Sequence, residues 1–167
     1  KLSAFYLNNG YISAQVGDPV VTHDDEWISI TIPVTEGKQF RTGTVKITGD
    51  SLAVPHEKLM EKLTIVQKDY FDREAIMRDI DFLTEACNNE GFAYASVIPQ
   101  TVPREREQEV DVTYVIEKGP LVYISRIAIT GNTSTRDKVI RRELDVAEGD
   151  LYNRGNIKSS YAALNRL

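Results

Sequence analysis

The residues best suited to acid–base chemistry or metal binding stand together at His23, Asp24, Asp25 and Glu26. An imidazole and three carboxylates at this spacing could bind a cation. The cluster falls between two stretches that are typical of strands, however, and charged residues are usual in such turns. The corresponding loop further along the chain, 104–107, alternates arginine and glutamate. We therefore expect a solvated turn.

Two other side chains could carry chemistry, and neither has the partners that it would need. His56 follows Pro55 in the first turn of a predicted helix, with no second histidine or cysteine at ligand spacing. Cys87 lies on the apolar stripe of a longer predicted helix, which favours a small buried residue over a nucleophile. Phosphate-binding glycine loops and the common hydrolase motifs are absent from the sequence. We predict no enzyme activity, no cofactor and no metal.

Composition narrows the class of protein further. The chain is 41% hydrophobic and 27% charged, which is typical of a folded globular protein. Its formal net charge of −5, with no run of lysine or arginine, argues against a nucleic-acid partner. With a single cysteine, no internal disulfide can form. The chain begins at Lys1 without a methionine or a signal peptide, so we expect a fragment of a longer protein.

The chain repeats itself with a period of about 80 residues. Four segments recur in the same order, shifted by 81 or 82 positions. At a shift of 81, residues 69–73, Ile76 and Leu83 match 150–154, Ile157 and Leu164, and Asn8, Gly10, Tyr11, Ala14 and Val16 match Asn89, Gly91, Phe92, Ala95 and Val97. At a shift of 82, Ile28, Ile30, Ile32, Val34 and Gly37 match Val110, Val112, Tyr114, Ile116 and Gly119, and Val45, Ile47, Thr48 and Gly49 match Ile127, Ile129, Thr130 and Gly131.

This period divides the chain into three parts, which we call the first, middle and third modules. Residues 1–37 are the C-terminal part of one module, 38–118 a complete module, and 119–167 the N-terminal part of another. The linkers 35–39 and 117–120 are short, so adjacent modules should be oriented and not freely tethered. Half a module cannot bury its helices, so we expect frayed or partner-stabilised structure near the C-terminus.

The middle module begins with a strand and two helices. Residues 40–48 are β-branched and alternating, which predicts a strand. Pro55 suits the first turn of a short helix. Asp72 is a good N-cap for a longer helix whose apolar residues recur at steps of three and four. Gly91 is placed to end that helix in the left-handed conformation.

Two strands complete the module, at 93–102 and 110–117, around a charged loop at 103–109. The resulting order is β-α-α-β-β. The fold class that we predict is α+β, in which each module has a three-stranded mixed sheet with two antiparallel helices on one face.

The first strand of each terminal hairpin is expected at a sheet edge. Pro99 lies inside one of them and Pro19 inside its counterpart, and proline cannot donate to a ladder. Pro33, in the partner strand of the first module, fits this interpretation less well. An exposed edge can pair with an extended peptide; an edge blunted by its prolines or covered by the neighbouring module is the alternative. The candidate edge residues are Ala93, Tyr94, Ala95, Ser96, Val97 and Ile98 in the middle module, and Ile12, Ala14, Val16 and Val20 in the first.

A βααββ module of about 80 residues with linkers reading Glu-Gly-Lys-Gln-Phe and Glu-Lys-Gly-Pro-Leu resembles the polypeptide-transport-associated (POTRA) domain family. The third module looks like the membrane-proximal POTRA domain of the Gram-negative outer-membrane protein assembly factors. This likeness rests on 129–133, Asp137, 139–144, 148–150, Tyr152 and 164–167. The resemblance covers the whole chain and implies the end of a third POTRA domain, all of a fourth and the start of a fifth.

The resemblance implies a periplasmic scaffold that is attached to the outer membrane by a C-terminal barrel absent from these residues. Such a scaffold would receive unfolded outer-membrane proteins from periplasmic chaperones, bind them by β-augmentation and dock accessory lipoproteins. By similarity, the docking residues are Arg141, Arg142 and Glu148, for which a merely solvated surface is the alternative. The POTRA region of a protein-export or autotransporter-assembly barrel, or of a cell-division protein, also stays open.

Overall fold

The computed structural model describes residues 1–133 and 135–166. By spatial proximity the chain forms two compact units. One contains 1–47, 60–80 and 99–114, and the other contains 48–59, 81–98 and the chain from 115 onwards. Each unit therefore combines about half of the middle module with one neighbouring module.

The first module is a helix followed by a long hairpin. Its helix and strands are α1 (Leu2–Leu7), β1 (Gln15–Val16), β2 (Val20–His23), β3 (Ile28–Thr31) and β4 (Val34–Thr35). β1 pairs antiparallel with β4, and β2 pairs antiparallel with β3. Pro33 lies in the break between the two ladders, where the Gly17 N–H donates to its carbonyl oxygen over 2.9 Å. A Cβ at Gly17 would lie 2.8 Å from Pro33 Cγ, so glycine makes room for the proline.

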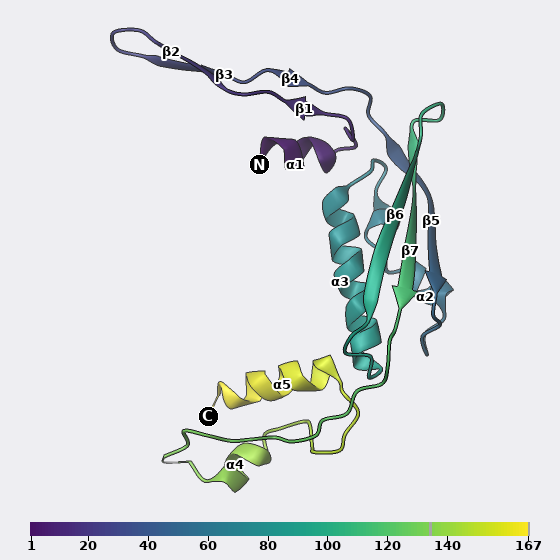
Figure 1. The fold of residues 1–167 in the computed structure, drawn as a ribbon, viewed down its shortest axis with the longest axis vertical. Helices are drawn as coiled ribbons and strands as arrows, with labels where there is room; N and C mark the ends of the chain where they lie inside the picture. The colour runs from purple at the N-terminus through teal and green to yellow at the C-terminus, as the bar shows by residue number, and fades with distance from the viewer. Residues whose placement is uncertain (134, 167) are drawn as a thin grey trace. The chain divides into compact units, whose positions relative to one another are not determined.

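The middle module holds a three-stranded sheet in the order β5-β7-β6. Its strands are β5 (Arg41–Gly49), β6 (Ser96–Arg104) and β7 (Glu109–Glu117). The Arg41 N–H donates to Gln108 O at one end of the sheet, and the Asp50 N–H donates to Ile116 O at the other. β5 therefore runs parallel to β7, whereas β6 and β7 form an antiparallel hairpin (Figure 1). The predicted mixed sheet is confirmed.

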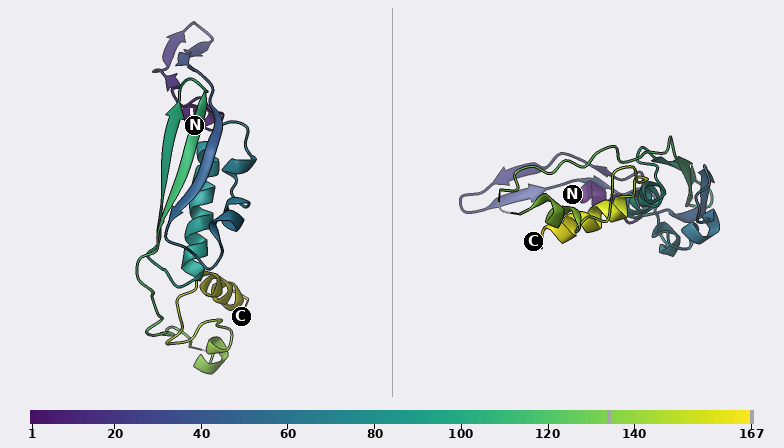
Figure 2. Two further views of the ribbon diagram at one scale, coloured as in Figure 1. Left: turned by 90° about the vertical axis from the view of Figure 1, so that its right-hand side faces the viewer. Right: turned by 90° about the horizontal axis from the view of Figure 1, so that it is seen from below.

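Two α-helices and a 3₁₀ turn accompany this sheet: α2 (His56–Met60), η1 (Ile65–Gln67) and α3 (Arg73–Asn89). Asp72 caps α3 as predicted, because its Oδ1 accepts the N–H groups of Glu74 and Ala75 at 2.9 and 3.1 Å. Gly91 follows the helix at φ +99°, the left-handed conformation expected there. α3 lies along one face of the sheet (Figure 2).

The core of the middle module comes from one face of β7 and the apolar side of α3. Every second residue of β7 is buried, as the alternation predicted: Val110, Val112, Tyr114 and Ile116. Burying these side chains contributes on the order of 2 kcal/mol each. Ile76, Leu83 and Cys87 are buried on the helix side.

A buried carboxylate ties α3 to the turn before it and to the sheet. Asp79, 1% exposed, accepts hydrogen bonds from the N–H groups of Thr64 and Ile65 at 2.5 and 3.0 Å, and from the Tyr114 hydroxyl at 3.0 Å. Burial, and then the charge of Asp79, raises the pKa of Tyr114 well above its ordinary value. Three donors satisfy a charge that would otherwise be costly to bury.

The third module repeats the helical part of the middle one. Its helices are α4 (Asp137–Arg141) and α5 (Arg154–Leu164), and Asn153 caps α5 by accepting the Asn156 N–H over 2.9 Å. Ser160 stands where the middle module has Asp79, and its hydroxyl accepts the Asp145 N–H over 2.8 Å, as Asp79 accepts that of Thr64. Among the described residues, none of the helices combines the length and apolar character that a membrane crossing requires.

Candidate binding edge and module junctions

The edge strand of the middle module is β6, which ends the sheet as its prolines predicted. The strand begins later than expected, however. Ala93, Tyr94 and Ala95 lie in a turn, in which the Ala95 N–H donates to Phe92 O over 3.2 Å. Only Ser96, Val97 and Ile98 of the six candidate edge residues are on β6. The turn forms because the chain must reverse direction after Gly91 before it can join the sheet.

The prolines of β6 indicate which of its backbone groups face outward. Pro99 and Pro103 both lie on β6, four positions apart, so their backbone groups point to the same side. A proline cannot donate to β7, so this side is the open one. The N–H groups that remain available on it are those of Val97 and Thr101.

The opposite edge of the sheet is partly covered at its N-terminal end. Arg41 on β5 forms an antiparallel bridge with Tyr70. The Thr42 N–H donates to Asp69 O over 3.2 Å. Of the two edges, β6 therefore offers the more accessible row of backbone groups.

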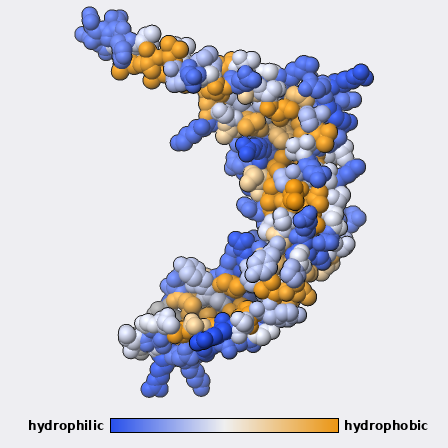
Figure 3. All heavy atoms as spheres, viewed as in Figure 1, coloured by the Kyte–Doolittle hydropathy of each residue, from blue (hydrophilic) through white to orange (hydrophobic). Residues whose placement is uncertain are grey.

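The first-module edge also differs from its predicted extent. Ile12 and Ala14 precede β1 in a turn, whereas Val16 lies on β1 and Val20 on β2. The apolar side chains of this hairpin are largely exposed (Figure 3): Val20, Val21, Trp27, Ile28, Ile30 and Ile32.

The junction between the first and middle modules rests on an Asn-Asn-Gly segment. Asn8 Oδ1 accepts the Glu74 N–H over 3.2 Å, and Asn8 Nδ2 donates to Glu74 Oε2 over 3.1 Å. The Phe40 N–H donates to Gly10 O over 2.8 Å. Gly10 is at φ +84°, and a Cβ there would lie 2.5 Å from Phe40 O. Glycine is therefore required where the two modules meet.

The junction between the middle and third modules repeats this pattern 81 to 82 residues later. Asn89 Oδ1 accepts the Gly155 N–H over 2.9 Å. The Val122 N–H donates to Gly91 O over 3.0 Å. Lys158 Nζ lies 2.6 Å from Glu85 Oε1, and this hydrogen bond lowers the pKa of Glu85. These residues were missed as functional candidates, although the recurrence of Asn8 and Gly10 as Asn89 and Gly91 was visible in the repeat.

The three predicted docking residues of the third module have different surroundings. Arg141 donates to Asp137 Oδ2 over 2.8 Å and to Ile127 O over 3.1 Å, and the bond to Asp137 raises its pKa. Glu148 Oε1 accepts the Ile127 N–H over 2.9 Å and lies 3.7 Å from Arg141. This pair therefore holds both backbone groups of Ile127, as a neighbouring strand would. Arg142 has a 67% exposed side chain, and within residues 1–133 and 135–166 it pairs only with the adjacent Glu143.

The family model for POTRA, described as "Surface antigen variable number repeat", matches residues 40–119 and again 122–167. The chain belongs to the POTRA family.

Relatives of these POTRA domains include the outer membrane protein assembly factor BamA of Nitratidesulfovibrio vulgaris, 34% identical over 99% of the chain, and that of Neisseria meningitidis, 33% identical over 96%. The chain spans about a fifth of the length of these relatives, 21% and 20%. Among solved structures, Haemophilus influenzae BamA POTRA3-5 matches with a TM-score of 0.78 at 26% identity, over 99% of this chain and 66% of that one.

The remaining side chains that could carry chemistry lie in a turn, at the start of a helix and in the core of this POTRA chain. Asp24 and Trp27 exchange backbone hydrogen bonds that close the β2–β3 turn, and the acidic cluster around them is exposed, as expected. Within residues 1–133 and 135–166, no group of three or more histidine, cysteine or acidic residues could hold a metal. His56 begins α2 and lies 3.2 Å from Asp50 O. Cys87 is buried in the core, and burial raises its pKa.

Proposed function

We propose that this chain is part of a periplasmic scaffold in an outer-membrane protein assembly factor, where it binds unfolded client proteins by strand addition and docks accessory lipoproteins. The observation that supports this most directly is the open edge of β6, which ends a sheet in a POTRA module. Edge pairing uses main-chain hydrogen bonds and makes little demand on client sequence. A scaffold that passes clients on would bind them weakly.

The relatives supply the cellular context of this proposal. They are named outer membrane protein assembly factors, and this name supports our proposal that the chain lies on the periplasmic side of the outer membrane. We propose the module division 1–37, 38–118 and 119–167, to which the family matches at 40–119 and 122–167 lend support. The same division would make the chain the end of a third POTRA domain, a whole fourth and the start of a fifth.

For the client, we propose a register on β6. The strand added there would accept hydrogen bonds from Val97 and Thr101 and donate to carbonyl groups on the same side. Pro99 and Pro103 remove the other two donors of that row, so pairing stays partial. Two missing donors in four positions make the edge a weak template, which suits reversible binding.

For lipoproteins, we propose the face around Arg142. Its guanidinium is exposed and, among the residues that the structure describes, engages only the carboxylate of Glu143, so it is available to a partner's acidic group. Arg141 and Glu148 would contribute mainly by holding Ile127 and thereby shaping this face.

The test is an amide NMR titration of the chain with a peptide copied from an outer-membrane β-strand. Saturable shifts at the amides of Val97 and Thr101, with smaller changes at Ile98 and Gln100, support strand addition on β6. As a matched pair, Thr101→Pro removes an outward donor and should weaken binding about tenfold, the effect of losing one hydrogen bond without rescue. Thr101→Val keeps that donor and should bind as the native chain does.

Shifts confined to other surfaces, or none at millimolar peptide, would contradict strand addition at β6. Equal binding by the proline and valine variants would contradict the proposed register.

A further inference from the structure

A β-bulge shapes the outer edge of β5, the edge of the sheet opposite β6. The Thr42 N–H points outward, to Asp69 O, whereas the Asp50 N–H just after the strand donates inward, to β7. In a regular strand, residues eight positions apart would face the same side. One extra residue therefore lies between them. The Thr44 N–H marks its place, because it donates to the Asp111 side chain on β7 over 2.6 Å.

The bulge turns both backbone groups of Val45 outward. Counting back from Asp50 in steps of two places Lys46 and Thr44 on the β7 side. Val45 and Ile47 therefore lie on the outer side. Within residues 1–133 and 135–166, no backbone group from outside the sheet bonds the N–H or the carbonyl oxygen of Val45. An edge with such unpaired groups can pair with an extended chain.

The equivalent edge of the third module is closed by two side chains. The residue that corresponds to Val45 at a shift of 82 is Ile127. Glu148 Oε1 accepts the Ile127 N–H over 2.9 Å, and Arg141 Nη2 donates to Ile127 O over 3.1 Å. These bonds show independently that both backbone groups at this position face outward. They also show what fits there, namely one acceptor and one donor placed as in the amide backbone of a strand.

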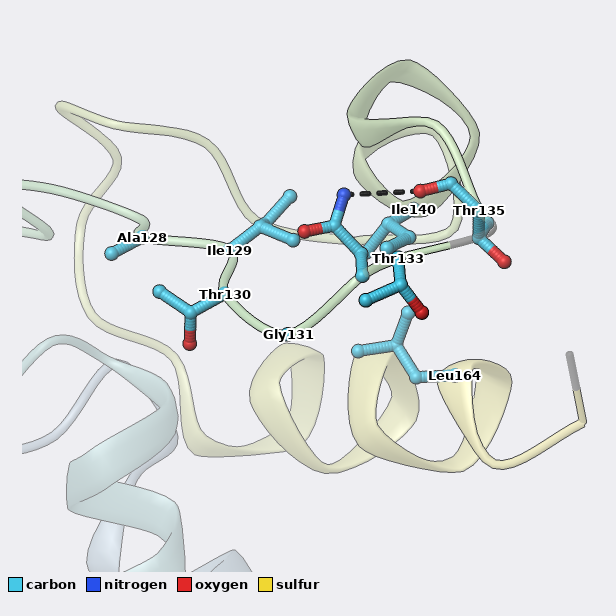
Figure 4. A pocket seen from close by; sticks show the side chains of 9 residues that line it. Ala128, Ile129, Thr130, Gly131, Thr133, Thr135, Ile140 and Leu164 are labelled. Carbon is cyan, nitrogen blue, oxygen red and sulfur yellow. Dashed lines mark hydrogen bonds between the residues drawn. The ribbon is translucent and has the colours of Figure 1, made fainter.

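A small niche accompanies this edge in both modules. In the middle module it is a cavity of about 220 Å³ lined by Thr42, Gly43, Val45, Met60, Val66 and Lys68. In the third module it is a cavity of about 200 Å³ lined by Ile127, Arg141, Leu144, Val146, Ala147 and Glu148. The latter is separate from the larger groove of that module, because Ile140 of α4 lines the groove and the next residue, Arg141, lines the niche (Figure 4).

The two niches differ in the side chains that stand at the edge. At a shift of 81, Arg141 corresponds to Met60 and Glu148 to Gln67. Met60 has no group that can donate to a carbonyl. From η1, the residue that lines the middle niche is the 50% exposed Val66 and not Gln67. The middle niche is therefore apolar where the third module has a charged pair, and an apolar side chain of a partner fits it.

We propose that the β5 edge at Val45 is a second docking site of the middle module, which binds an extended peptide segment that presents one apolar side chain. The backbone of the segment bonds the N–H and the carbonyl oxygen of Val45, and its apolar side chain enters the niche against Met60 and Val66. The bulge confines pairing to the part of β5 beyond Thr44, so the site recognises a single residue and its neighbours. It does not depend on the strand addition proposed for β6. In the third module, Arg141 and Glu148 close the same site.

The test is an NMR titration of the chain with a short blocked peptide in which one leucine is flanked by threonines. We expect saturable shifts at the amides of Val45 and Ile47 and at the methyl group of Met60. The same peptide with alanine in place of leucine should bind about tenfold more weakly, because its side chain leaves the niche unfilled.

Two variants block different parts of the site. Met60→Arg combined with Gln67→Glu copies the closing pair of the third module, and Val66→Trp fills the niche. Each should weaken binding of the leucine peptide about tenfold, the first by occupying the backbone groups and the second by excluding the side chain. Val54→Trp, at a 42% exposed site before α2, is the matched control and should bind as the native chain does.

Absence of shifts at Val45 with millimolar leucine peptide overturns the proposal, whatever happens at Val97 and Thr101. Unchanged affinity in both blocking variants also overturns it. Equal affinity for the leucine and alanine peptides overturns the role of the niche. Shifts at Val45 without shifts at Val97 and Thr101 support this site and contradict only the strand addition proposed for β6.

Discussion

Asn89 and Gly155 meet across a module junction, where the side-chain oxygen of Asn89 accepts the backbone N–H of Gly155 over 2.9 Å. Asn8 and Glu74 make the same bond at the preceding junction over 3.2 Å. One asparagine at the end of a helix thus accepts a backbone N–H in the first turn of the next module's helix. The repetition of this contact gives both junctions the same local geometry.

We predict that Asn89→Ala weakens the second junction by about 1 kcal/mol, because the Gly155 N–H loses its acceptor. Amide hydrogen exchange at Gly155 should speed up about fivefold. Asn89→Asp keeps an acceptor oxygen and should leave the exchange rate near its native value. Unchanged protection in Asn89→Ala would mean that the contact contributes nothing to the junction.

Asp79→Ala should lower the free energy of unfolding of the middle module by roughly 3 kcal/mol, since it leaves three donors without their acceptor. Urea denaturation followed by circular dichroism measures this change. Asp81, exposed on the same helix, provides the control, and Asp81→Ala should change stability by less than about 0.5 kcal/mol. Similar effects of the two variants would argue against the buried network.

The raised pKa of Tyr114 predicts a loss of stability at high pH. The folded state keeps this phenol protonated, whereas the unfolded state releases the proton near pH 10, so stability is complete below that pH and falls as pH rises above it. The free energy of unfolding should therefore decline more steeply above pH 10 in the native chain than in Tyr114→Phe. Tyr94→Phe, at a 75% exposed site, should follow the native profile.

Substitutions of Arg141 and Arg142 should distinguish an effect on folding from an effect on lipoprotein docking. Arg141→Ala removes a donor to Ile127 O and should increase amide exchange around residue 127. Arg142→Ala should leave stability within about 0.5 kcal/mol, because its side chain is exposed. We expect Arg142→Ala to weaken the binding of an acidic lipoprotein partner, as measured by calorimetry. The rate of amide hydrogen exchange around residue 127 should stay unchanged in this variant. If both variants lose binding and both show faster amide exchange, the two arginines stabilise the fold and neither acts in docking alone.

The sequence by itself determined the repeat, the order of elements and most of the core. These depend on local periodicity: the alternation along β7, the apolar steps of α3 and the cap at Asp72 each act within a few residues. The same local signals identified β6 as an edge, because proline excludes a ladder donor wherever it stands. The family resemblance rested on these features and was confirmed.

Only the tertiary structure decided which partners the polar groups have. Asp79 receives donors from residues 14 and 15 positions earlier and 35 later, and Asn89 bonds a residue 66 positions away. No local pattern encodes such distances. The start of β6 at Ser96 likewise depends on the turn that follows Gly91. The hydrogen bond from Arg141 to Ile127 O depends on the path of the backbone at residue 127. Contacts between segments far apart in sequence form only when the chain has folded, so their chemistry becomes visible only in the fold.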